Sequence, residues 1–167
     1  MGNVNYPYLP EGRSFGYVPS SHPMMREARR VCEEQSTDKN HPTGSVLVRD
    51  GRVLAEGANQ ASFKNPALLE FHRTKFCLRR FFHIKTGAHY WLCPGCASPA
   101  QHSEQVVIRN ARVKNSDSRE ADIYLWGHWW CCKSCWDAMI VAGIKDVYLV
   151  EGAKGQFQRG AGTDSHK

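Results

Sequence analysis

The chain has 167 residues, of which 41% are hydrophobic and 23% charged, values typical of one folded domain and not of a disordered chain. It has no run of 18 apolar residues and no recognisable leader, so we expect neither a membrane span nor a signal peptide, and a cytoplasmic location. The formal net charge of +6 favours anionic partners, either free nucleotides or a polynucleotide backbone.

The first third of the chain is predicted to form an arm, a helix and a hairpin. Residues 1–22 are rich in Pro, Tyr, Gly and Asn without periodicity, which predicts an irregular surface arm. Pro23 suits a first helical turn, and apolar residues follow at helical spacing to about residue 36. Segments 45–49 and 52–56 flank an Asp-Gly pair typical of a type I′ turn, so they predict a β-hairpin.

The remaining chain alternates helical and strand patterns. A helix is expected from Asn65 toward residue 83, followed by a long loop to about residue 101. Further elements are expected in the order helix, strand, helix, strand, at about 102–111, 123–126, 132–142 and 145–150. This alternation predicts parallel strands covered by helices, in one domain over residues 23–151. The Gly-rich residues 152–167 are expected to form a flexible tail.

Four of the seven cysteines occur in Cys-x-x-Cys pairs, Cys93 with Cys96 and Cys132 with Cys135. In a chain without an export signal this spacing is typical of metal ligands before disulfides. The two pairs therefore predict zinc binding.

The stretch His102-Ser103-Glu104 places an imidazole and a carboxylate at a predicted helix start. Residues two apart point in nearly opposite directions in mid-helix, but at the first turn both side chains can converge beyond the helix end. Cys132 and Cys135 begin another helix, whose N-terminus favours thiolates. One imidazole and two thiolates leave a tetrahedral zinc one position for a water, whose pKa falls toward about 7. Glu104 is then the natural proton carrier.

A second, closed zinc site is predicted at the other pair. Cys77 would join Cys93 and Cys96 as a ligand, and the alternative is that all three are buried small hydrophobic residues. The spacing leaves three candidates for the fourth donor, namely His72, His83 and His89.

The spacing His102-x-Glu104 followed by Cys132-x-x-Cys135 resembles the zinc-dependent cytidine and deoxycytidylate deaminase superfamily. The resemblance covers about residues 24–151. It includes the predicted hairpin and the segment GHWWCCKSCWDAMIVAGIKDVYLV, which is similar to the family's metal helix and following strand. The residues around Cys77, and from Cys93 to Gln105, are similar to the deoxycytidylate deaminase branch.

The resemblance implies an α/β/α three-layer sandwich whose mixed sheet begins with the hairpin and continues with parallel strands. It implies that Asn59 contacts substrate, and Ser103, Trp129 and Trp130 are assigned to substrate as well. The chain departs from the family at Cys131, where Pro is usual, and at Ser103, where Ala is frequent. Because of the first departure, Cys131 with Cys135 is an alternative ligand pair, although its spacing is less typical. Members of the family commonly form dimers or hexamers, so a homo-oligomer is expected.

The expected reaction is hydrolytic deamination, with a zinc-activated water attacking C4 of cytosine while Glu104 accepts and returns a proton. Deoxycytidylate, converted to dUMP, is the first candidate substrate. The alternatives are a cytosine or adenine base in single-stranded DNA, RNA or tRNA, and a zinc-stabilised binding module that is not an enzyme.

Aromatic and basic residues near these motifs have two interpretations each. Trp126 and Trp136 fall within regular elements and are assigned to the core. Arg79, Arg80 and Lys85 are candidates for a phosphate contact, although basic residues on a helix are usually solvated.

Overall fold

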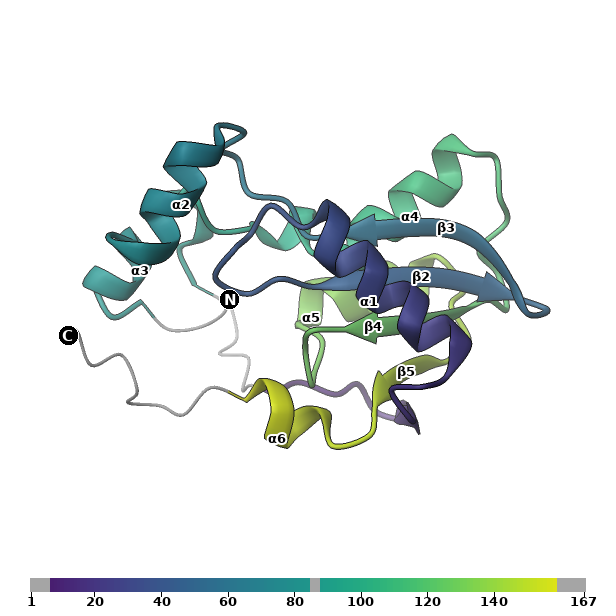
Figure 1. The fold of residues 1–167 in the computed structure, drawn as a ribbon. Coiled ribbons are helices and arrows are strands. Elements are labelled where there is room, and N and C mark those ends of the chain that lie inside the picture. The colour runs from purple at the N-terminus through teal and green to yellow at the C-terminus, as the bar shows by residue number, and fades with distance from the viewer. Residues whose placement is uncertain (1–6, 85–87, 159–167) are drawn as a thin grey trace.

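The computed structural model describes residues 7–84 and 88–158 and shows a five-stranded mixed sheet with helices on both faces (Figure 1). The strands are β1 (Phe15–Val18), β2 (Gly44–Arg49), β3 (Arg52–Ala58), β4 (Asp122–Trp126) and β5 (Val147–Val150). The helices are α1 (Pro23–Gln35), α2 (Pro66–Thr74), α3 (Leu78–Phe81), α4 (Ser103–Val113), α5 (Lys133–Val141) and α6 (Ala153–Phe157). None of the helices in these described ranges is long and apolar enough to cross a membrane.

The sheet has the strand order β1-β5-β4-β2-β3. The predicted hairpin is confirmed, because β2 and β3 are antiparallel and Asp50 and Gly51 both have the positive φ angles that a type I′ turn requires, 50° and 71°. Strand β2 is also antiparallel to β4, whereas β4 and β5 are parallel. The expected mixed sheet, begun by a hairpin and continued by parallel strands, is therefore present.

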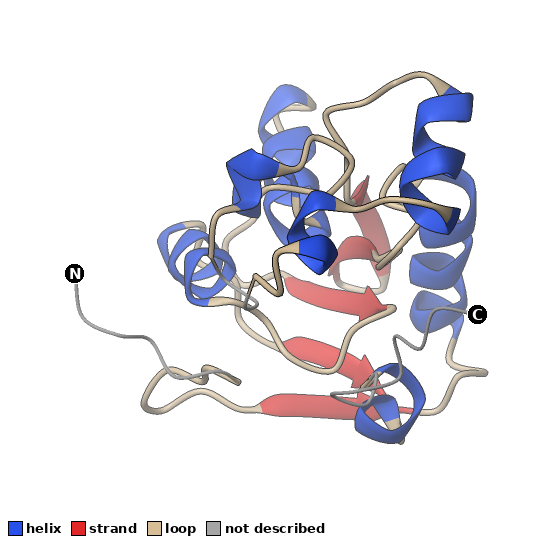
Figure 2. Ribbon diagram, turned by 90° about the vertical axis from the view of Figure 1, so that its left-hand side faces the viewer, coloured by secondary structure: helices blue, strands red, loops and turns tan. Residues whose placement is uncertain are grey.

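Three layers follow from where the helices pack. Helix α1 lies on one face of the sheet, and α4 and α5 lie on the other; Figure 2 shows the strands with helices on either side. Two glycines allow these close approaches, because a Cβ on Gly44 would meet the backbone of α1 and a Cβ on Gly57 would meet the backbone of α4. The apolar core fills both interfaces and includes Val46, Leu47, Val107, Ile123, Leu125 and Trp136.

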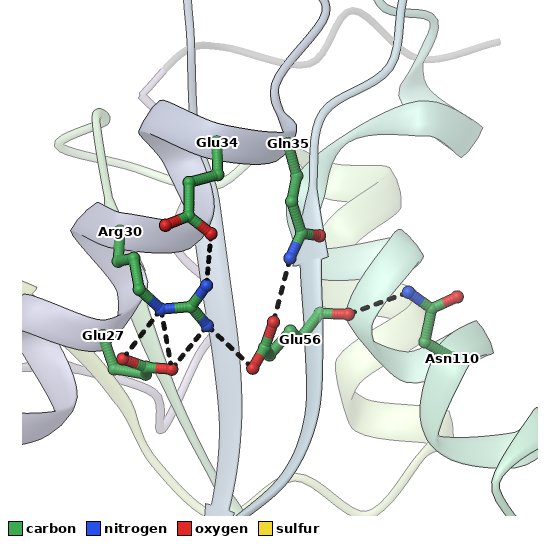
Figure 3. A network of polar contacts seen from close by, with 6 residues as sticks. All are labelled: Glu27, Arg30, Glu34, Gln35, Glu56 and Asn110. Carbon is green, nitrogen blue, oxygen red and sulfur yellow. Dashed lines mark hydrogen bonds and ion pairs between the residues drawn. The ribbon is translucent and has the colours of Figure 1, made fainter.

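A polar network on the surface connects the two helical layers across β3 (Figure 3). The Arg30 guanidinium of α1 contacts Glu27 on its own helix and Glu56 on β3, the latter at 2.9 Å. Glu56 also accepts from Gln35 Nε2 at 2.9 Å, and its backbone carbonyl accepts from Asn110 Nδ2 of α4 at 2.8 Å. The groups are partly exposed, so the ion pairs of this network add little to the stability of the fold.

Two predictions about the chain ends are corrected by the structure. The arm is not irregular throughout, because Phe15–Val18 forms β1 and pairs in parallel with β5 at the edge of the sheet. Four residues are too few for a strand signal, and the pairing depends on an exposed edge that only the folded sheet provides. In the expected flexible tail, Ala153–Phe157 forms α6, and Phe157 packs edge-on against Trp126 with ring centroids 5.4 Å apart. Residues 159–167 of that tail lie outside the described residues.

The helix predicted over residues 65–83 is broken into α2 and α3. Lys75 to Cys77 separate the two, and Cys77 has an extended backbone with φ −122° and ψ 118°. In a continuous helix, residues 72 and 77 would lie about 140° apart around the axis and their side chains would diverge. The break brings the side chain of Cys77 close to that of His72, so both can belong to one group of metal donors.

We expect Gly44→Ala to lower the free energy of unfolding by about 2–3 kcal/mol, because the new Cβ would lie 2.4 Å from Ala28 O and Cys32 N, both backbone atoms. The matched control is Gly155→Ala in α6, where no atom lies within 4 Å of the new Cβ. Urea unfolding measures both, and equal stability of the two variants would contradict the close packing of α1 on β2.

Candidate active site

The residues of the HxE and CxxC motifs meet where two helices begin. His102 and Cys132 are the N-cap residues of α4 and α5, and both have extended backbones that turn their side chains beyond the helix end. Glu104 lies in the first turn of α4, and Cys135 lies in the first turn of α5. The two helices pack against each other, so four side chains from distant parts of the chain share one location.

The geometry of these donors fits a metal ion. His102 Nδ1 lies 3.5 Å from the Sγ atoms of both Cys132 and Cys135, and the two sulfurs lie 3.4 Å apart. Ligands of a tetrahedral zinc ion are separated by about 3.5 to 3.8 Å, given ordinary zinc–nitrogen and zinc–sulfur bond lengths. Within the described part of the chain, no fourth His, Cys, Asp or Glu joins this group. The set therefore leaves a coordination position open.

The contact between Cys132 and Cys135 favours the thiolate form of Cys132. The hydrogen bond between the two thiols lowers the pKa of Cys132 to about 5 and raises the pKa of Cys135 well above its usual value. Burial lowers the pKa of His102, but a hydrogen bond to Cys132 and the charge of Glu104 outweigh it and raise the pKa. Concentrated negative charge of this kind attracts a cation.

Glu104 is buried and held in place by hydroxyl groups. Its Oε2 accepts a hydrogen bond from Ser103 Oγ at 3.1 Å, and Ser103 Oγ in turn accepts from Ser45 Oγ of β2 at 2.9 Å. Burial of Cys131, together with the charge of Glu104 and a hydrogen bond to it, raises the pKa of the Cys131 thiol well above its usual value. Cys131 thus supports the carboxylate and does not join the metal donors.

A cavity of about 310 Å³ opens above these residues. It includes His102, Glu104 and Cys132 in its walls, together with Trp129 and Trp130, the two tryptophans assigned to substrate from the sequence. Ser103 is not among the lining residues and is fully buried, so the structure places it beneath Glu104 and not against a substrate. Trp126 and Trp136 are buried in the core as predicted.

Asn59 lines the cavity, but most of the hydrogen-bonding capacity of its amide group is already used within the protein. Its Oδ1 accepts hydrogen bonds from Ser36 Oγ at 2.6 Å and Thr43 N at 2.9 Å, and its Nδ2 donates to His41 O at 2.7 Å. The side chain therefore shapes the loop between α1 and β2, which itself forms part of the cavity wall. The second Nδ2 hydrogen of Asn59 remains available to donate to a substrate.

Several wall residues were not predicted from the sequence, because their place at the cavity depends on how distant segments fold together. His128 is one that its place beside the CxxC segment could have indicated. Its Nδ1 accepts from Trp130 N at 3.3 Å, and burial lowers its pKa, so the neutral ring presents Nε2–H as a donor. The other unpredicted wall residues are Asp38, His41, Thr43, Tyr90, Ala97, Phe157 and Gln158, and the wall also includes Arg79, which the sequence offers as a candidate for a phosphate contact.

A second group of donors joins His72 to Cys77, Cys93 and Cys96. His72 Nε2 lies 3.2 Å from Cys93 Sγ and 3.6 Å from Cys96 Sγ, and Cys77 Sγ lies 3.9 Å and 3.7 Å from the same two sulfurs. Burial lowers the pKa of His72, but hydrogen bonds with Cys77 and Cys93 outweigh it and raise the pKa to about 9. Four buried donors at these separations fit a closed tetrahedral zinc site, with His72 as the fourth donor among the three histidines considered.

This second group also supports the wall of the cavity. Asn40 Nδ2 lies 3.1 Å from His72 Nδ1, so the loop between α1 and β2 contacts the histidine of this group. Asp38 Oδ2 accepts from Ala97 N at 2.9 Å, and Asp38, Cys96 and Ala97 all line the cavity. A metal bound by His72 and the three cysteines would therefore also stabilise one wall of the cavity at the His102 site.

The comparison with known families agrees with this geometry. The family model described as the cytidine and deoxycytidylate deaminase zinc-binding region matches residues 19–151. The chain belongs to this family. It is a zinc-dependent hydrolytic deaminase. Of the alternatives that the sequence leaves open, membership of this family supports an enzyme and not a binding module without activity.

Solved structures with similar folds belong to deaminases with different substrates. The dCMP deaminase from the cyanophage S-TIM5 is 19% identical, with a TM-score of 0.49 and coverage of 81% of this chain and 86% of that one. A diaminohydroxyphosphoribosylaminopyrimidine deaminase/5-amino-6-(5-phosphoribosylamino)uracil reductase from Thermotoga maritima is 24% identical, with a TM-score of 0.44. The match covers 75% of this deaminase but only 28% of that protein. No curated protein sequence matches the chain.

We expect the purified protein to contain two zinc ions per chain, and Cys93→Ser to contain one, because serine replaces a soft thiolate with a weak ligand. Cys32→Ala is the matched control, since Cys32 is buried in the apolar core outside both donor groups. Elemental analysis of the folded proteins measures the zinc content. Two ions in Cys93→Ser would contradict the second site.

We expect Ser103→Ala to lower kcat about tenfold while KM and zinc content stay near their original values, because the hydroxyl contacts Glu104 and lies outside the cavity wall. Steady-state kinetics measure both constants. An increase in KM without a change in kcat would show that Ser103 contacts substrate, as predicted from the sequence, and would contradict the buried position.

Proposed function

We propose that this deaminase converts cytosine to uracil in a (deoxy)cytidine nucleotide by hydrolysis, with deoxycytidylate as the first candidate substrate. The proposal is supported by one observation above all, namely that a buried carboxylate lies beside an open set of three metal donors, and that this carboxylate and two of the donors, His102 and Cys132, line one cavity. A closed, structural metal site has no use for a buried carboxylate beside it, whereas hydrolysis needs one.

The residues of the site would divide the chemistry between them. His102, Cys132 and Cys135 would hold the zinc ion. When bound, zinc lowers the pKa of a water molecule so that the water can lose a proton at neutral pH. Glu104 would accept one proton from that water and pass it to N3 of the ring, and would then accept the remaining proton of the same oxygen, once it is bonded to C4, and transfer it to the departing ammonia. The hydrogen bond from Ser103 keeps the carboxylate oriented during both transfers.

The cavity wall suits a flat base with a polar edge. Trp129 and Trp130 are half-buried beside the metal donors and offer aromatic faces to a ring. The Nε2–H of His128 can donate to the carbonyl oxygen O2, which cytosine has and adenine lacks. This donor is the reason we favour cytosine over adenine.

A positive charge also lies at the cavity. Arg79 of α3 lines it, and its guanidinium stacks 3.9 Å above the ring of Tyr90, another wall residue. Arginine fits the geometry of a phosphate group, so a nucleotide is a better candidate than a free nucleoside. The second basic residue considered, Arg80, is engaged with the carbonyls of His72 and Arg73, and Lys85 lies outside the described residues.

We expect Glu104→Gln to reduce the turnover of deoxycytidylate by a factor of about 10²–10⁴, because an amide cannot accept and return the proton. The loss of the cytosine absorbance band and the release of ammonia measure turnover. Glu11→Gln, at an exposed position of the arm, is the matched control and should have full activity.

Zinc content must be unchanged in Glu104→Gln, because the carboxylate is outside the metal-donor group. Full activity of this variant would defeat the assigned role of Glu104. Turnover of a purine nucleotide in preference to deoxycytidylate and cytidine would overturn the choice of cytosine.

A further inference from the structure

The segment between β3 and α4 carries almost all of the net charge of the protein. Residues 61–101, which we call the insert, contain six Lys or Arg residues and one Glu, so they account for five of the six net positive charges of the chain. The insert contains α2, α3 and the donors of the closed metal group, and it lies beyond one end of the sheet (Figure 1). A basic region of this kind attracts polyanions.

The insert also exposes aromatic rings that a folded protein would ordinarily bury. Every exposed Phe and Trp in the described ranges belongs to it, with exposed fractions from 41% for Phe76 to 77% for Trp91. Phe81 contacts Phe76 and Phe82 with ring centroids 5.4 Å and 5.0 Å apart, so these rings form one cluster. The cluster is interleaved along the chain with Lys75, Arg79 and Arg80.

The charges decide between the partners that could cover such rings. A second copy related by two-fold symmetry would place basic residues against basic residues, which opposes association. The partner should instead be anionic and should offer flat apolar groups for stacking. Single-stranded nucleic acid has both, since its phosphates are charged and its bases are free to stack on aromatic rings. A duplex keeps its bases stacked on each other.

The insert reaches the cavity directly. Arg79 comes from the same short helix as Phe81, and Tyr90 packs edge-on against His102 with ring centroids 5.7 Å apart. We propose that the insert is a binding surface for single-stranded nucleic acid, and that a bound strand presents one of its cytosines to the cavity. The second half of this statement rests on the proposed function, and the first half does not.

Binding is tested by fluorescence anisotropy with a labelled 12-nucleotide strand that has one central cytosine among thymines, and with its RNA counterpart. Phe81→Ala combined with Phe82→Ala should weaken binding about tenfold or more, because two stacking platforms are lost. Lys64→Gln combined with Lys75→Gln should weaken binding and reduce its dependence on salt. The matched control is Val113→Ala combined with Lys114→Gln, an exposed apolar residue and an exposed charge at the end of α4, which should bind within about twofold of the original protein.

The outcomes separate this inference from the proposed function. Turnover of deoxycytidylate without binding of either strand overturns the inference and leaves the proposed function intact. Binding that the Phe81 and Phe82 substitutions weaken, without deamination of any cytosine, supports the surface and defeats the proposed function. A duplex of the same sequence and poly-glutamate are also tested. If either binds as tightly as the single strand, the inference is overturned, because stacking on unpaired bases would then play no part. Unchanged zinc content in all variants shows that the insert is still folded.

Discussion

The structure depends on the convergence of two helix N-termini, which brings an imidazole, two sulfurs and a carboxylate into one buried location. Such a group is unfavourable on its own, because buried negative charge loses its hydration. A divalent cation reverses the balance, since it binds the thiolates and leaves the carboxylate beside it as a base. The sheet has to place α4 and α5 side by side for this to happen, and Gly57 allows α4 to approach β3 closely enough.

The closed donor group solves a different problem. The insert has little apolar core of its own, because its buried cluster consists of Cys77, Cys93 and Cys96 with Leu78 packed against them. Four metal ligands can stabilise a small segment that hydrophobic burial cannot. Through Asp38 and Asn40 the same ligands are connected to the loop between α1 and β2, so a metal bound by them would stabilise both the insert and one wall of the cavity.

The protein therefore separates chemistry from recognition. The sheet and its two covering helices provide the metal donors and Glu104, and these are the features that identify the family. The aromatic and basic residues that we propose for recognition lie instead in loops and in the insert. Changes in the insert can alter what is bound without disturbing the residues that transfer the proton, a division that is common where rigid elements carry a site and loops surround it.

Local patterns along the chain were enough to predict the hairpin, α1, the helix and strand order of the second half and the two metal-donor motifs, because turn chemistry, periodicity and ligand spacing are local properties. Cytoplasmic location and homo-oligomeric assembly stay predictions. Three features became apparent only in the folded chain: β1 joins the sheet edge, the helix over residues 65–83 breaks, and His72 is the fourth donor of its group. Ser103, assigned to substrate from the sequence, is buried in the structure and donates a hydrogen bond to Glu104. These features depend on contacts between residues far apart in the chain, and spacing along the sequence carries no information about which of several candidates a fold will bring together.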